Sequence, residues 1–241
     1  SHRNLELVVI DDGSTDDTRV RLRRLQTEDS RLRVFGQDHL GIAAALIHGM
    51  NVIDGSDYVA RMDSDDVSHP RRLELQLSEL KKHPELGVVD CQVRLKESPV
   101  TGEGMADYIT WLNSLIGAGS QELNLLVESP MVHPAAMFRR AAYDDAGGYL
   151  DNDEPEDYSL WLRMVSRGWK LGKLPEYLLE WNDLPGRLTR TDSRYGRDRF
   201  LALKARYLEK LYPQCRGRLA IWGAGRDGTS LFRALSASLE I

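Results

Sequence analysis

The chain has 241 residues, of which 41% are hydrophobic and 29% are charged, and its formal net charge is −5. This composition suits one large soluble domain with a sizeable core, and it gives no support for nucleic-acid binding through a broad basic surface. No apolar run reaches the roughly 18 to 20 residues of a membrane span, and no signal-peptide pattern opens the chain. The two cysteines stand far apart without metal-type spacing, so we expect a reducing, cytoplasmic location, compatible with peripheral association at the inner face of the membrane.

Strands and helices alternate through the first part of the chain. The patterns predict helices that include residues 41–50 and 71–82, and strands at residues 5–10, 32–35, 58–62 and 86–93. The apolar run at 5–10 is almost continuous, which is typical of a buried parallel strand. The alternation predicts a parallel, doubly wound α/β sheet, in which ligands bind at the carboxyl ends of the strands.

The second part of the chain is less regular. We expect strands at residues 130–139 and 169–174, and helices at 105–115, around 121–127, at 158–165 and at 200–211. Residues 181–199, between the last strand and the last helix, form a basic, polar loop.

Two acidic turns follow strands of the predicted sheet, one at Asp11–Asp12 and one at Asp63–Asp66. In an extended segment Asp63 and Asp65 fall on the same side, because side chains alternate with period 2. Two carboxylates that face one way repel each other unless a cation lies between them, and hard divalent cations such as Mg²⁺ and Mn²⁺ prefer oxygen ligands. The alternative is a solvated acidic turn, which is common and needs no metal.

The end of the chain carries a different pattern. A strand-like run at 218–222 is followed by Gly223, Gly225 and Gly228 in Gly-x-Gly-x-x-Gly spacing and then by a helix-like segment. This is the context of a dinucleotide-binding fingerprint, but the acidic ribose contact expected about 20 residues later is absent. We therefore expect residues 213–241 to be the beginning of a second, Rossmann-like domain and not a complete nucleotide site.

Three motifs occur in order along the chain: Val8–Asp16, Ala60–Asp66, and Gly147–Tyr149 followed by Glu156–Arg163. As an ordered set they resemble the inverting family 2 glycosyltransferases of the GT-A fold, over roughly residues 5–180. The resemblance implies a nucleotide-diphospho-sugar transferase fold, with a Rossmann-like, mostly parallel mixed sheet flanked by helices. It also implies a glycosyltransferase domain over residues 1–212 that is N-terminally incomplete, because the family normally begins with a further strand and helix.

The resemblance implies a nucleotide site built from both acidic turns. Asp12 would face the nucleobase with Asp11 beside it, and Ser14 belongs to the same turn. Asp63 would contact the ribose. A UDP-sugar is the default donor of the family, and the acceptor would be a hydroxyl of a saccharide, a lipid-linked sugar or another molecule.

The resemblance also implies the metal site and the catalytic base. Asp63, Asp65 and the adjoining Asp66 would hold Mg²⁺ or Mn²⁺ on the donor diphosphate, where the metal neutralises the leaving group. Asp157, with Glu156 beside it, would take the proton of the acceptor hydroxyl, and one-step displacement would invert the anomeric centre. For Glu156 the alternative is a helix N-terminus at which a carboxylate complements the helix dipole.

Each of four further side chains has two possible roles, one functional and one structural. Arg187 and Arg190, in the basic loop with Arg194, either close over the diphosphate or belong to a solvated loop. His133 is either a histidine of a core strand or a third metal contact. Trp161 is either a core residue or a platform that stacks on a sugar ring.

Three other functions compete with glycosyl transfer. A nucleotidyltransferase also uses metal-bound carboxylates at strand ends. A signalling receiver domain would use Asp11–Asp12 and Asp63 as a phosphoacceptor pocket, but it is about half this length and leaves Glu156–Asp157 unexplained. The third is a non-catalytic relic that binds a sugar nucleotide without transferring the sugar.

Overall fold

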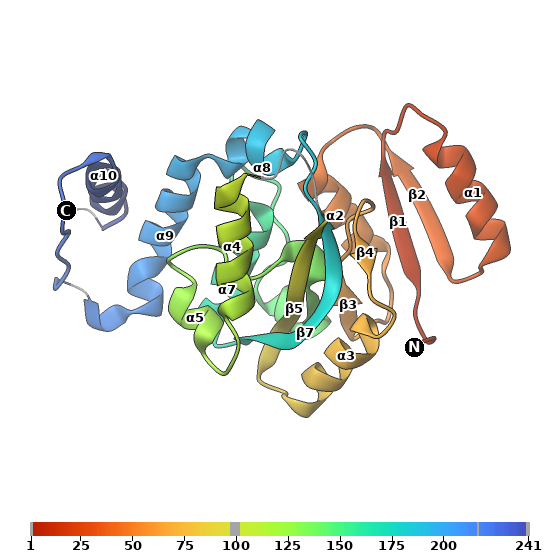
Figure 1. The fold of residues 1–241 in the computed structure, drawn as a ribbon, viewed down its shortest axis with the longest axis horizontal. Coiled ribbons are helices and arrows are strands. Elements are labelled where there is room, and N and C mark those ends of the chain that lie inside the picture. The colour runs from red at the N-terminus through yellow and green to blue at the C-terminus, as the bar shows by residue number, and fades with distance from the viewer. Residues whose placement is uncertain (1, 97–101, 216, 240–241) are drawn as a thin grey trace.

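A computed structural model describes residues 2–96, 102–215 and 217–239 of the chain. Its centre is a five-stranded sheet in the order β3-β6-β5-β7-β4 (Figure 1). The strands are β3 (Tyr58–Ala60), β4 (Val67–Ser68), β5 (Leu86–Lys96), β6 (Met137–Arg139) and β7 (Lys170–Asn182). β5 and β7 run parallel, whereas β6 is antiparallel to β3 and β5, and β4 is antiparallel to β7. The sheet is mixed and flanked by helices, which confirms the predicted fold class.

The strands β1 (Leu7–Asp12) and β2 (Leu32–Gln37) form a second, two-stranded parallel sheet, joined by helix α1 (Thr18–Glu28). In the described part of the chain β1 pairs with β2 alone, so the single doubly wound sheet expected from the alternation is divided in two. Helix α2 (Ile42–Val52) connects the two sheets, because it packs on β1 and leads into β3. A Cβ atom on Gly49 would lie 3.5 Å from Ile10 Cγ1, so the small residues of α2 allow a close approach to the strand.

The core lies on both faces of the five-stranded sheet. Val88 and Val89 are neighbours on β5 but belong to different apolar clusters, because successive side chains of a strand point to opposite faces. One cluster joins the sheet to helices α6 (Arg140–Asp145), α7 (Glu156–Ser166) and α9 (Arg197–Leu211). The other joins it to helices α3 (Arg72–Lys82) and α4 (Glu103–Ser114).

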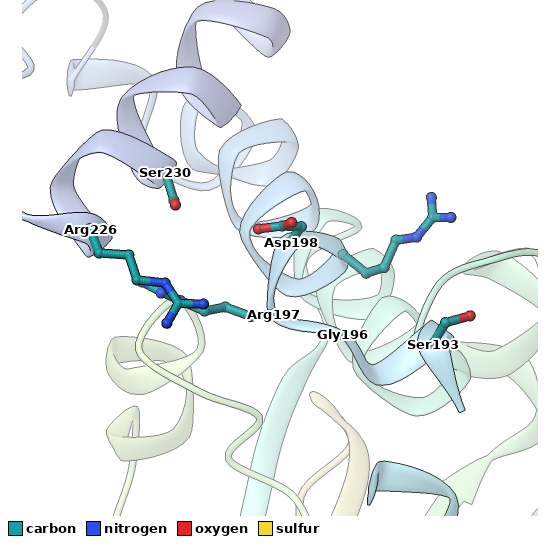
Figure 2. Close-up of a pocket in the computed structure, with 7 residues that line it drawn as sticks. Ser193, Gly196, Arg197, Asp198, Arg226 and Ser230 are labelled. Atoms are coloured by element: carbon teal, nitrogen blue, oxygen red, sulfur yellow. The ribbon is translucent and has the colours of Figure 1, made fainter. Parts of the chain in front are cut away.

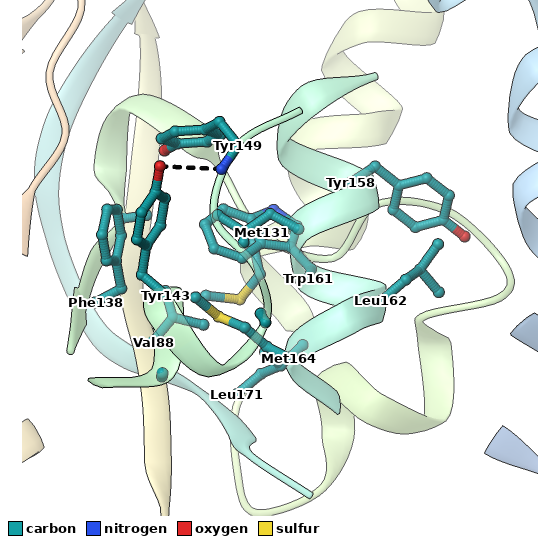
Figure 3. Close-up of a cluster of buried hydrophobic side chains, with 14 of the residues drawn as sticks. Val88, Met131, Phe138, Tyr143, Tyr149, Tyr158, Trp161, Leu162, Met164 and Leu171 are labelled. Atoms are coloured by element: carbon teal, nitrogen blue, oxygen red, sulfur yellow. Dashed lines mark hydrogen bonds between the residues drawn. The ribbon is translucent and has the colours of Figure 1, made fainter. Parts of the chain in front are cut away.

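Trp161 of α7 lies at the centre of the first cluster (Figure 3). Its side chain has no exposed surface, and Met131, Tyr143 and Met164 belong to the same cluster. The structure thus places Trp161 in the core, where it fixes α7 against the sheet. The same packing fixes the first turn of α7, which carries Glu156 and Asp157.

The second half of the chain departs from the sequence-based strands and loops in three places. Where a strand was predicted at 169–174, β7 continues to Asn182. The apolar run at 130–139 is not one strand, because His133–Ala135 form a short 3-10 helix, η1, before β6 begins at Met137. The polar loop after β7 contains helix α8 (Leu188–Thr191) and the 3-10 helix η2 (Ser193–Tyr195). The remaining short elements are α5 (Ser120–Asn124) and η3 (Pro213–Cys215).

The end of the chain forms helix α10 (Arg226–Leu239), which packs on α9 (Figure 1). The strand expected at 218–222 is not formed: residues 218–224 have no regular secondary structure, and no described strand runs beside them to accept its hydrogen bonds. Among the described helices, none is long and apolar enough to cross a membrane.

Candidate functional site

The acidic turn after β3 brings three carboxylates together. One oxygen each of Asp63, Asp65 and Asp66 lies within 4.8 Å of the others. Asp66 is buried, and its Oδ1 accepts a hydrogen bond of 2.9 Å from the backbone N–H of Asn182. Its Oδ2 is also buried and has no hydrogen-bond partner among the described residues. Burial, together with the neighbouring Asp63 and Asp65, raises the pKa of Asp66 to about 6.

These features fit a hard divalent cation. Mg²⁺ and Mn²⁺ take oxygen ligands, and three carboxylates supply them at one point of the turn. A buried carboxylate oxygen without a partner is costly unless a ligand or ion satisfies it. The geometry therefore brings together the residues that the sequence assigned to the metal, although His133 is not part of this cluster.

Arg61 lies beside the acidic turn and was not identified from the sequence. Its side chain is 8% exposed, and its guanidinium forms an ion pair of 2.6 Å with Asp63. The sequence signal was its place between strand β3 and the acidic turn, because an arginine that is buried usually has an oppositely charged partner.

Glu156 and Asp157 open helix α7 on the other side of the site. Glu156 is 3% exposed, and its Oε2 accepts a hydrogen bond of 2.7 Å from the hydroxyl of Tyr195. The Nδ1 atom of His133 lies 3.7 Å from Glu156 Oε1, and its Nε2 is 2.8 Å from the hydroxyl of Tyr149. Burial holds the pKa of His133 well below its usual range, so its ring is neutral and joins a buried polar network. Glu156 is thus a member of this buried network, and it also lies in the first turn of α7, where a carboxylate complements the helix dipole.

The pKa of Asp157 lies close to neutral pH. Burial and then the neighbouring Glu156 raise the pKa of Asp157 to about 7, while Arg61 acts in the opposite direction. A carboxyl group whose pKa lies near neutral pH can accept a proton and still be largely ionised at slightly higher pH.

The first acidic turn is engaged in local contacts. Hydrogen bonds from Ser14 and Arg19 lower the pKa of Asp11, whose Oδ1 lies 3.0 Å from the backbone nitrogen of Ser14. The carboxylate of Asp12 accepts hydrogen bonds of 2.7 Å from Gln37 Nε2, 2.9 Å from the N–H of Leu40 and 2.9 Å from the N–H of Gly41. Burial opposes the ionisation of Asp12, but these hydrogen bonds outweigh it and lower its pKa. In this structure Asp12 fixes the loop that begins α2.

The basic segment after β7 is organised around Asp183, which is 1% exposed. Arg187 Nη1 and Arg190 Nη2 lie 3.5 Å and 2.8 Å from Asp183 Oδ1. The guanidinium of Arg187 also lies 4.4 Å from the centre of the Trp181 ring. Arg194 differs, because its Nη1 is buried and has no hydrogen-bond partner among the described residues. Arg194 therefore has at least one buried donor left for an anion.

Both ends of this segment are attached to the acidic groups. Asn182, the last residue of β7, donates its backbone N–H to Asp66 and its side-chain amide to the carbonyl of Asp65. Tyr195 in η2 donates to Glu156. Neither residue stands out in the sequence, because an asparagine at a strand end and a tyrosine in a polar loop are ordinary there.

Two hollows lie outside the carboxylate clusters. One, of about 370 Å³, is lined by residues of α9 and the start of α10, among them Arg197, Arg226 and Ser230 (Figure 2). The other, of about 510 Å³, lies beside β2 and is lined by Asp11, Arg19 and Gln37 among others. The first adjoins the glycine-rich fingerprint, and Arg197 on its wall is paired with Asp227.

Comparisons with known proteins agree with the motifs. A sequence model described as glycosyl transferase family 2 matches residues 1–147. The chain is 32% identical over 184 residues to the putative glycosyltransferase EpsE of Bacillus subtilis (strain 168), covering 74% of this chain and 62% of that protein. It is 28% identical over 188 residues to the amylovoran biosynthesis glycosyltransferase AmsE of Erwinia amylovora, covering 73% and 63%. The chain thus spans a little over 60% of the length of these two relatives.

A solved structure shares the fold. The mannosyltransferase PcManGT from Pyrobaculum calidifontis, in complex with GDP-Man and Mn²⁺, superposes with a TM-score of 0.55 at 18% identity. The similarity covers 96% of this chain and 60% of that one.

Proposed function

The chain belongs to glycosyl transferase family 2, and on this premise we propose that it moves a sugar from a nucleoside diphosphate donor to an acceptor hydroxyl with inversion of the anomeric centre. One observation carries the proposal. The three carboxylates after β3 and the near-neutral carboxyl group of Asp157 are linked through Arg61, which pairs with Asp63 and acts electrostatically on Asp157. This arrangement supports the proposal, because displacement of a diphosphate calls for both a metal-binding group and a base.

The donor side of the proposed site is the acidic turn. Asp63, Asp65 and Asp66 would hold Mg²⁺ or Mn²⁺, which when bound neutralises charge on the departing diphosphate. Asn182 orients Asp66 through its backbone N–H, so the buried Oδ2 of Asp66 is kept in place for a ligand. Arg194 adds a cation with an unused donor, which suits a phosphate oxygen.

The acceptor side is the first turn of α7. Asp157 would take the proton of the attacking hydroxyl, and Glu156 would position it from within the network of Tyr195 and His133. Hydroxyl attack on the face opposite the leaving group gives inversion in one step. The proposed acceptor is a saccharide or a lipid-linked sugar, in the synthesis of a cell-envelope polysaccharide, since AmsE is described as an amylovoran biosynthesis enzyme.

Two observations bear on the nucleobase of the sugar donor, and they point to different nucleotides. A UDP-sugar is the family default, whereas the superposed mannosyltransferase holds GDP-Man and Mn²⁺. We propose a UDP-sugar, with a GDP-sugar as the competitor to be measured beside it. We also propose that residues 1–212 form the glycosyltransferase domain and that residues 213–241 begin a second unit.

The most informative experiment is calorimetry with UDP and GDP, with and without Mn²⁺, followed by release of the nucleoside diphosphate from UDP-glucose, UDP-galactose and GDP-mannose. Binding that requires the metal, and release that Asp157→Asn abolishes, support the proposal. Asp151→Asn is the matched control, because Asp151 is an exposed carboxylate of the same acidic run.

Metal-independent nucleotide binding would contradict the roles of Asp63, Asp65 and Asp66. Equal release rates of the wild type and the Asp157→Asn variant would instead favour the non-catalytic, sugar-nucleotide-binding alternative.

A further inference from the structure

The backbone of Arg61 is fixed by hydrogen bonds at both its N–H and its carbonyl group. Its N–H donates to the carbonyl of Ala136 at 2.9 Å, and its carbonyl accepts from Arg72 Nη2 at 3.0 Å. The side chain is 8% exposed and forms the 2.6 Å ion pair with Asp63. Burying a guanidinium is costly unless negatively charged groups lie near it. The burial of Arg61 therefore indicates that Asp63 is not its only acidic neighbour.

The second group of partners belongs to α7 and the segments packed against it. Ala136 directly follows η1, whose first residue, His133, lies 3.7 Å from Glu156. The guanidinium of Arg61 acts electrostatically on Glu156 and on Asp157. Arg61 is therefore paired with Asp63 of the metal-binding turn and lies within electrostatic range of the carboxylates that open α7.

We propose that Arg61 is a positioning residue of the transfer reaction, whose guanidinium holds the metal-binding turn and the catalytic base in one arrangement and stabilises their combined negative charge. The inference rests on the proposed function. Without a cation near them, partly buried carboxylates on two different elements repel each other. A guanidinium suits this place, because it stays charged and presents five donors in a fixed plane.

The inference has a consequence for the base. The pKa of Asp157 is raised by burial and by Glu156 and is lowered by Arg61. Among the described residues, Tyr108, Tyr149, Tyr158 and Tyr195 also interact electrostatically with Asp157, and these tyrosines are neutral at neutral pH. Loss of the Arg61 charge should therefore raise the pKa of Asp157 further and leave less of the base ionised at neutral pH.

The test compares Arg61→Met and Arg61→Lys with Arg163→Met. Arg163 is a matched control, because it is a partly buried arginine of α7 that donates to the carbonyl of Ala146 on the side of the tyrosine cluster. Rates of nucleoside diphosphate release from the preferred donor with Mn²⁺ are measured from pH 6 to 10. We expect Arg61→Met to lower kcat about 100-fold, with KM for the donor changed less than about threefold, since an ineffective general base costs roughly 10²- to 10⁴-fold.

The midpoint of the acid limb of kcat should move to higher pH in Arg61→Met, and Arg61→Lys should recover part of both effects. Arg163→Met should lower the thermal midpoint but keep the wild-type kcat and pH profile. An Arg61→Met protein with wild-type kcat and acid limb would overturn the inference.

Two measurements do not depend on turnover. Mn²⁺ affinity, followed by electron paramagnetic resonance, should change far less than kcat in Arg61→Met, because loss of a neighbouring positive charge favours cation binding and offsets the loosened contact with Asp63. Loss of Mn²⁺ binding in proportion to kcat would show that Arg61 acts only through the metal-binding turn, and would overturn its link to the base.

The carboxyl titration of Asp157, followed by ¹³C NMR and identified by its absence in Asp157→Asn, should shift to higher pH in Arg61→Met. A wild type that releases no nucleoside diphosphate from any donor would refute the proposed function, and this titration would still decide the inference, because an unchanged midpoint refutes it.

Discussion

The hydroxyl of Tyr195 donates a hydrogen bond of 2.7 Å to the buried carboxylate of Glu156, and this contact attaches the segment after β7 to the first turn of α7. The same segment begins at Asn182, whose N–H donates to Asp66. Its two ends are therefore attached to the two acidic parts of the site. Release of either end breaks a hydrogen bond to a buried carboxylate, so we expect the order of this segment to follow the state of the site.

Replacing Tyr195 with Phe should loosen this attachment. The change leaves a buried oxygen of Glu156 without its donor, and a lost hydrogen bond to a buried charged group costs about 1–3 kcal/mol. We expect a fall of this order in the free energy of unfolding, measured with urea, and faster proteolysis within residues 183–195. Tyr177→Phe is the control, because Tyr177 is 46% exposed on β7. Equal unfolding midpoints for Tyr195→Phe and the wild type would mean that the hydrogen bond is not maintained in solution.

The parts of the site that could be predicted from the sequence are those in which one short segment contains the whole signal. Asp63, Asp65 and Asp66 come together because they lie on one turn, so their spacing sufficed. Tyr195 acquires its role from Glu156, which is distant in sequence, and Arg61 acts both on the nearby Asp63 and on the distant Glu156. Such pairings depend on how β3, α7 and η2 pack, and local residue patterns do not contain that information.

In the fold, too, the features encoded by one short segment could be predicted, and those that depend on long-range pairing could not. The run at 5–10 and the helix at 41–50 were expected because apolar periodicity is a local property. The separation of β1 and β2 from the other strands, and the antiparallel direction of β6, depend on pairing across the sheet. Residues 218–222 have the apolar character of a strand, yet a strand also needs a neighbour to hydrogen-bond with, and none is described beside them.

Arg190 and Arg194 should respond differently to removal. Arg190 lies 2.8 Å from the buried Asp183, so Arg190→Ala leaves that carboxylate with less compensation and should lower stability by about 1–2 kcal/mol. Arg194 has a buried donor without a partner, so Arg194→Ala should change stability little but weaken UDP binding with Mn²⁺ about tenfold, as loss of one charge-assisted phosphate contact does. Calorimetry and urea unfolding on both variants separate the two roles. Weaker UDP binding in Arg190→Ala alone would reverse the assignment.

The acidic turn should bind a divalent cation without a bound nucleotide. Mn²⁺ titrated into the protein should bind at one site, and treatment with EDTA should abolish binding of UDP, because the diphosphate has lost its counter-charge. Asp65 is exposed, so Asp65→Ala should weaken Mn²⁺ binding by about tenfold or more, as the loss of one carboxylate ligand does, with little change in the thermal midpoint. Asp54→Ala, which removes an exposed carboxylate outside the turn, is the control. UDP binding that survives EDTA would exclude the metal from donor binding.

Helix α10 should be dispensable for the rest of the fold. It packs on α9, where Leu235 is 6% exposed, and Arg197 pairs with Asp227 across the contact. Removing residues 213–241 should therefore cost about 1–3 kcal/mol of burial and leave UDP and Mn²⁺ binding unchanged. Thermal unfolding and calorimetry of the shortened chain measure both effects. A shortened chain that fails to fold would show that α10 belongs to the same domain as α9.

The carboxyl group of Asp157 should destabilise the protein at neutral pH. Its pKa is about 7 in the folded protein, against an ordinary value of 3.8, so the folded state binds more protons than the unfolded state between these values. The contribution of Asp157 to stability therefore falls as pH rises from about 4 to about 7 and stays unfavourable above that. Asp157→Asn should then raise the free energy of unfolding by about 2 kcal/mol at pH 8, a reduced value because the side chain is only partly buried, and by almost nothing near pH 4.

Urea unfolding of the wild type and the Asp157→Asn variant at both pH values tests this prediction, with Asp151→Asn expected to show no such difference. A variant that is less stable than the wild type at pH 8 would mean that the ionised carboxylate is stabilised in the fold, and Asp157 would then lack the near-neutral pKa that suits it to accept a proton.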